Sequence, residues 1–90
     1  MIDQTLEIRG IPVTHLVTYL VECGGSVQSE AWPISVLGDC WQADLLREET
    51  VTITSRFHVN AVFIHITSHD EERFAHFMKR FRTKLLRVGG

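Results

Sequence analysis

The last quarter of the chain carries an apolar pattern that most constrains the fold. Five apolar side chains recur at the spacing of one helix face, at Phe74, Phe77, Met78, Phe81 and Leu85. Ser68 followed by Glu71 fits a capping box at the start of this helix, and Gly89–Gly90 fit its end. A helix with an aromatic underside needs a cover, and we expect the rest of the chain to supply it as a sheet.

The N-terminal quarter reads as a strand followed by a second helix. Apolar and polar residues alternate over residues 2–9, the pattern of a half-buried strand, and Gly10 breaks it. Pro12 suits the first turn of a helix, and Gly24–Gly25 suit its end. The apolar stripe of this helix consists of Val13, Leu16, Val17, Leu20 and Val21.

Residues 26–67 carry strand signals and no helical period. The expected strands are 27–31, 34–37, 41–45, 50–54 and 59–67. Gly38–Asp39 and Glu48–Glu49 read as turns, while 55–58 could be a turn or a bulge. The strand 59–67 is apolar on both faces near its middle, which predicts either a central position in the sheet or a second face that meets a partner.

These elements predict one α+β domain over residues 1–90. The expected architecture is a two-layer sandwich, an antiparallel sheet of four to five strands with two helices on one face, in the order β-α-β-β-β-β-α. The other face of such a sheet would be open. We therefore expect a homodimer, formed through that face or by pairing of sheet edges, with Trp41 and Phe63 as the apolar outer positions.

Charge is divided unevenly along the chain. Residues 1–72 hold eleven acids and three bases, a balance of -8, whereas residues 73–90 hold six bases and no acid, a balance of +6. A basic helix beside an acidic sheet explains this division, and the alternative is an anion or nucleic-acid surface. The residues for that alternative are Lys79, Arg80, Arg82, Lys84 and Arg87. Because the whole chain carries a net charge of -2, nucleic acid is the less favoured partner.

Histidines and cysteines offer a second alternative, a metal- or thiol-dependent site. Its candidate ligands are His65, His69, His76 and Cys40. Their spacing matches no zinc signature, and Cys23 and Cys40 form no CxxC pair. We therefore predict no catalytic residue and no cofactor. The absence of a long apolar run and of a signal peptide predicts a cytoplasmic protein that does not span a membrane, with reduced cysteines.

The end of the chain resembles another class of protein. The residues Leu85-Leu86-Arg87-Val88-Gly89-Gly90 are similar to the tail of ubiquitin-like sulfur carriers, whose terminal glycine becomes an adenylate and then a thiocarboxylate. Those carriers are β-grasp domains in which a strand precedes the tail. Here a long helix is expected to precede it, so the predicted fold disagrees with the tail.

Three features together resemble a small family. They are the stretch Leu6-Glu7-Ile8-Arg9-Gly10-Ile11-Pro12, the helix end at Gly24–Gly25, and a Gly-x-x-Trp turn at 38–41, followed by a final strand and helix. The family is the accessory domain that follows the sulfur-carrier domain in some bacterial proteins related to the small subunit of molybdopterin synthase. The resemblance implies a fold like one half of a TATA-binding protein, with no catalytic residues to carry over. We therefore expect a non-catalytic binding module linked to molybdenum-cofactor or sulfur-transfer pathways, with an unknown protein partner.

Overall fold

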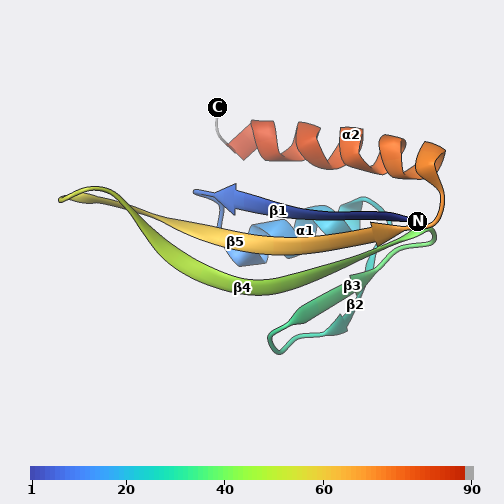
Figure 1. Cartoon of the computed structure of the whole chain (residues 1–90), viewed down its shortest axis with the longest axis horizontal. Coiled ribbons are helices and arrows are strands. Elements are labelled where there is room, and N and C mark those ends of the chain that lie inside the picture. The colour runs from blue at the N-terminus through green and yellow to red at the C-terminus, as the bar shows by residue number, and fades with distance from the viewer. Residues whose placement is uncertain (89–90) are drawn as a thin grey trace.

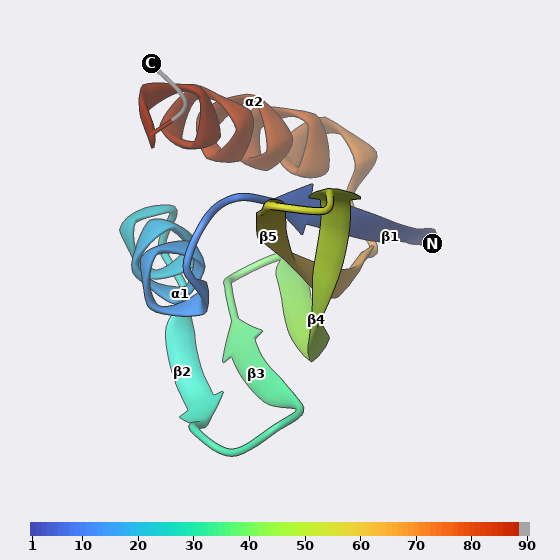
Figure 2. The ribbon, with the colours of Figure 1, turned by 90° about the vertical axis from the view of Figure 1, so that its left-hand side faces the viewer.

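The chain folds into a curved sheet whose inner face is covered by two helices (Figures 1 and 2). A computed structural model describes the backbone of residues 1–88 and the side chains of residues 1–86. The elements follow in the order β1 (Ile2–Arg9), α1 (Val13–Glu22), β2 (Ser26–Ser29), β3 (Ile34–Leu37), β4 (Trp41–Thr54), β5 (Phe57–Ser68) and α2 (Glu71–Val88). The predicted α+β class and element order are confirmed.

The sheet has five antiparallel strands in the order β1-β5-β4-β3-β2. Strand β5 pairs with β1 on one side and β4 on the other, which confirms its predicted internal position. One face of β5 is wholly aliphatic and fully buried, with Val62, Ile64 and Ile66 at 0% exposure. The apolar residues on both faces of this segment thus indicated a strand that lies inside the sheet, between two other strands.

Both helices contribute to one apolar core on this face. Leu16 and Leu20 of α1 and Phe81 of α2 are fully buried in the same cluster as the aliphatic face of β5. The predicted helix faces are confirmed except at Val21, which is exposed. No helix in residues 1–88 has the length and apolar character needed to cross a membrane.

The start of α2 differs from the predicted capping box. The backbone N–H of Arg73 donates to Oδ1 of Asp70 at 3.0 Å, so Asp70 caps the helix and Ser68 does not. Ser68 Oγ instead donates to the backbone oxygen of Cys40 at 2.7 Å, which ties the end of β5 to the connection before β4. The predicted helix end at Gly89–Gly90 lies outside the described residues.

The predicted turn at Glu48–Glu49 is wrong. Strand β4 runs without interruption from Trp41 to Thr54, and the chain reverses at 55–56. The predicted strands 41–45 and 50–54 are therefore one strand, and β4 and β5 form a long ribbon that extends beyond the helices (Figure 1). Two adjacent acids are typical of an exposed turn, and they are equally compatible with an exposed strand. Because this part of β4 has no buried side chains, the sequence shows no apolar alternation that would identify it as a strand.

The placement of Trp41 on the outer face is also wrong. Its indole is 4% exposed and lies against the ring of Phe77 in α2, with 4.2 Å between ring centroids. Phe63 does lie on the open face, where the guanidinium of Arg47 covers its ring at 4.1 Å from the centroid. The apolar content that motivated a dimer through the open face is thus largely covered, although the homodimer itself stays a prediction.

Candidate functional site

Trp41 organises the end of the molecule where α1, the β3–β4 connection and α2 meet. A Cβ added at Gly38 would lie 2.2 Å from the indole of Trp41, and one added at Gly25 would lie 2.7 Å from it. Both glycines therefore give the indole the room it needs to stack on Phe77. The helix end at Gly24–Gly25 and the Gly-x-x-Trp turn serve a single packing arrangement.

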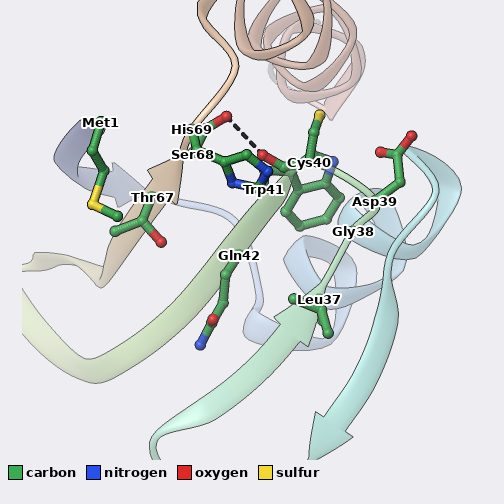
Figure 3. A pocket seen from close by; sticks show the side chains of 10 residues that line it. All are labelled: Met1, Leu37, Gly38, Asp39, Cys40, Trp41, Gln42, Thr67, Ser68 and His69. Atoms are coloured by element: carbon green, nitrogen blue, oxygen red, sulfur yellow. Dashed lines mark hydrogen bonds between the residues drawn. The ribbon is translucent and has the colours of Figure 1, made fainter.

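Two cavities flank this turn, and both share Asp39, Cys40 and Trp41. The first, here called the sheet-end cavity, has a volume of about 390 Å³. Figure 3 shows that its side chains come from the N-terminus, the β3–β4 connection and the end of β5. Its lining consists of Met1, Leu37, Gly38, Asp39, Cys40, Trp41, Gln42, Thr67, Ser68 and His69.

The second, here called the thiol cavity, has a volume of about 490 Å³. It is lined by Cys23, Gly24, Asp39, Cys40, Trp41, Arg73, His76, Phe77 and Arg80. The end of α1, the β3–β4 connection and α2 thus bring two buried thiols and three basic side chains to one hollow. Arg73 lies 3.5 Å from a carboxylate oxygen of Asp39, and Arg80 donates to the backbone oxygen of Glu22 at 3.0 Å.

The pKa of each thiol of this cavity is raised above its ordinary value. Burial raises the pKa of Cys23, and it does so against the lowering effect of the nearby Arg80 and Lys84. Burial also raises the pKa of Cys40, and the carboxylate of Asp39 beside it raises the pKa further. Because the thiolate is the nucleophilic form, the arrangement favours inert packing thiols over nucleophiles.

The four residues of the metal- or thiol-dependent hypothesis lie in three places. His65 is on the open face of the sheet, where its Nε2 lies 2.7 Å from a carboxylate oxygen of Asp3. His69 lines the sheet-end cavity, His76 lines the thiol cavity, and Cys40 borders both. Among the described residues, no group of three or more His, Cys, Asp or Glu side chains could hold a metal ion. The hypothesis therefore has no ligand set in this part of the chain.

The basic residues of α2 divide into two groups. Arg80 and Lys84 reach back to the end of α1, where Lys84 Nζ lies 3.1 Å from Oε1 of Glu22. This contact ties the helices together, as expected for a basic helix beside an acidic body. Lys79 and Arg82 are exposed and are in no ion pair with another described residue. The side chain of Arg87 lies outside the described residues.

Sequence reasoning missed the association of Cys23 with Cys40. The two residues are far apart in the chain, and only the packing of α1 beside the β3–β4 connection brings them to one cavity. It also missed Arg73 and Asp39, which pair across this cavity. Gly25 and Gly38 were the available signal, since each marks a close approach of the backbone to the Trp41 side chain.

Nearly the whole chain matches a known protein family. Residues 4–90 match the family described as archaeal MoaD-like protein, and the match spans every element from β1 to α2. No curated protein sequence gives a match. Because the family match covers nearly the whole chain, the relation to molybdopterin synthase small-subunit proteins inferred from the sequence is supported. The chain belongs to the family of archaeal MoaD-like proteins.

Proposed function

We propose that this chain is a non-catalytic protein-binding module that serves a molybdenum-cofactor or sulfur-transfer system. The observation that carries the proposal is the family match over 4–90 combined with a fold that is not that of a sulfur carrier. A β-grasp carrier has a strand before its glycine tail, whereas the helix α2 continues here to Val88. The chain fits the role of an accessory module with a fold like half of a TATA-binding protein.

The exposed basic side of α2 is the docking surface in this proposal. Lys79 and Arg82 point their charges to solvent, and Arg80, which is also exposed, lies beside Lys79 on the same helix. Opposite charge on a partner would speed and orient the encounter. An acidic protein surface is therefore the expected partner.

Nucleic acid is the second candidate for this surface. Single-stranded nucleic acid needs stacking platforms beside the cations, and the open face of the sheet would have to supply them. That face carries four acids, Asp3, Glu7, Asp44 and Glu49, against the two cations Arg9 and Arg47. Phe63, in the middle of this face, is already covered by Arg47, and Phe57 lies at the tip of the ribbon beside the turn. The face would repel phosphate, so an acidic protein is favoured.

Direct binding measurements test the proposal. Calorimetry at low salt should detect binding of the full chain to a purified MoaD-type sulfur carrier or to the enzyme that adenylates that carrier. The double charge reversal Lys79→Glu and Arg82→Glu should weaken this binding about tenfold, because both side chains are exposed cations of the docking surface. Arg56→Glu, at the far tip of the β4–β5 ribbon, is the matched control and should leave affinity unchanged.

Three results would overturn the proposal. The first is no binding to either protein. The second is binding to RNA or DNA whose affinity falls steeply with salt, which supports the nucleic-acid alternative. The third is formation of a thiocarboxylate on this chain when it is incubated with the adenylating enzyme, ATP and a sulfur donor, which supports a carrier role for Gly89–Gly90 instead.

A further inference from the structure

Strand β1 leaves one long edge of the sheet unpaired in the described structure. It pairs with β5 on one side and is the last strand of the sheet on the other. The opposite edge is β2, which is only four residues long and has an irregular register with β3. A long edge strand presents backbone N–H and C=O groups that another chain can pair with.

The hydrogen bonding of β1 shows which residues face this edge. Gly10, directly after β1, donates its N–H to the backbone oxygen of Asn60 at 2.9 Å, in continuation of the pair Arg9↔Ala61. Opposed residues in an antiparallel pair alternate between bonded and non-bonded positions. The even-numbered residues of β1 therefore bond to β5, and the backbone groups that point to the free edge belong to Asp3, Thr5, Glu7 and Arg9.

The side chains of these same four residues are all exposed on the open face of the sheet. They carry charges in the order negative, neutral, negative and positive. If a second copy pairs antiparallel with Leu6 opposite Leu6, then Asp3 faces Arg9 of the other copy at both ends of the ladder. A shift that places Thr5 opposite Thr5 instead brings Asp3 against Glu7, and one centred on Glu7 brings two glutamates together. Like charges directly opposite destabilise a strand pair.

We propose that two copies of this chain associate through β1, antiparallel and centred on Leu6, to form one continuous sheet. The proposal concerns a different surface from the docking surface on α2 and does not depend on it. The odd-numbered residues of each β1 then bond to the other copy, so every backbone group of the strand has a partner. Asp3 and Arg9, which now contact His65 and Glu7 of their own chain, gain an oppositely charged neighbour.

The core face of β1 gains from the same pairing. Leu6 and Ile8 are only partly buried in the single chain, although they pack on the core. In the proposed pair of β1 strands Leu6 would occupy a non-bonded position, where opposed side chains come closest, so it would pack on Leu6 of the second copy. A chain of 90 residues buries a thin core and benefits from such added contact.

Charge reversal gives the sharpest test. Sedimentation equilibrium should show a dimer for the wild-type chain. Asp3→Lys alone and Arg9→Glu alone should each weaken dimerisation at least about tenfold, because each turns both attractive end contacts into repulsive ones. Mixed together, the two variants should form a heterodimer of near wild-type affinity, since Lys faces Glu at one end and Arg faces Asp at the other.

A backbone variant tests the same edge without changing charge. Thr5→Pro removes an N–H that points to the free edge and leaves the bonds between β1 and β5 intact. It should give a folded monomer by circular dichroism and sedimentation. Thr5→Val keeps that N–H and should remain a dimer. Glu30→Lys, an exposed reversal outside the sheet, is the control for charge and should also remain a dimer.

The outcomes separate this interface from others. A wild-type monomer at concentrations well above micromolar would overturn the proposal. So would a dimer that is unchanged by Asp3→Lys, Arg9→Glu and Thr5→Pro, because association would then use the open face or another surface. Failure of the two charge variants to pair with each other would reject the register centred on Leu6.

Discussion

The two halves of β4 belong to one strand and have different surroundings. From Trp41 to Leu45, every second side chain is buried against the helices. From Leu46 to Thr54 no side chain is buried, and this half forms the ribbon with β5 that extends past both helices (Figure 1). The first half is held by core packing, and the second half by its pairing with one neighbour.

Specific contacts between β4 and β5 support the exposed half. Thr52 Oγ1 lies 3.1 Å from Nδ1 of His58 across the ribbon. Asn60 Nδ2 donates to the backbone oxygen of Ile11 at 2.6 Å and to Glu48 at 3.0 Å, which anchors the base of the ribbon to the segment before α1. The β-structure therefore persists in this half without burial, and the effect of a substitution on stability should depend strongly on its position along β4.

The largest effect is expected at the packed end. Trp41→Ala removes a 4% exposed indole and its stack on Phe77, and should lower the free energy of unfolding by about 3–5 kcal/mol. Trp32→Ala is the matched control, because this second tryptophan is 45% exposed and should change stability by about 0.5 kcal/mol or less. Urea unfolding followed by circular dichroism measures both. Equal losses in the two variants would contradict the assignment of Trp41 to the core.

At the packed end of β4, substitutions at Gly38 and Trp41 should have coupled effects on the free energy of unfolding. Gly38→Ala places a Cβ within 2.2 Å of the Trp41 indole, and should cost about 1–3 kcal/mol as the ring is displaced. In the Trp41→Ala background the same change should cost close to nothing, because the colliding ring is gone. A double-mutant cycle on unfolding free energies reads out this coupling. Additive losses would show that Gly38 is needed for another reason.

These positions show what the sequence could predict and what it could not. The helical period of α2 identified Phe74, Phe77 and Phe81 as buried, because one apolar helix face has few alternatives. The same kind of reasoning divided β4 at Glu48–Glu49, since an exposed strand has no burial pattern to read. The thiol cavity could not be predicted, because Cys23 and Cys40 line the same cavity only through tertiary packing.

The two buried thiols predict how stability varies with pH. Burial raises the pKa of Cys23 and Cys40 in the folded chain, so the unfolded chain releases these protons first as the pH rises. The contribution of the two thiols to the free energy of unfolding is complete below the ordinary thiol pKa of 9.0 and is lost as the pH rises above that value. Urea unfolding from neutral to alkaline pH should show this decline. The double variant Cys23→Ala and Cys40→Ala should show a flatter profile, and an identical slope would rule out the thiols as its source.

Asn60, which anchors the base of the ribbon, should have a moderate effect on stability. Asn60→Ala removes the donor to Ile11 and Glu48 and should cost about 1 kcal/mol, with greater hydrogen exchange along the ribbon than in the core. Thr50→Ala, directly opposite Asn60 on β4, is a control that keeps this donor. Equal exchange rates in the two variants would mean that strand pairing alone fixes the ribbon.

The smallest effect is expected at the tip of the ribbon. Phe57 is 56% exposed and lies opposite Thr54 beside the turn, far from the core cluster. Phe57→Thr keeps a residue that favours strands and buries no less apolar surface in the core, so the free energy of unfolding should change by about 0.5 kcal/mol or less. The contrast with Trp41→Ala, on the same hairpin, measures how far core packing extends along it. A loss at Phe57 comparable to that at Trp41 would mean that the ribbon tip is covered in solution, and a partner or second copy on the ribbon would then have to be sought.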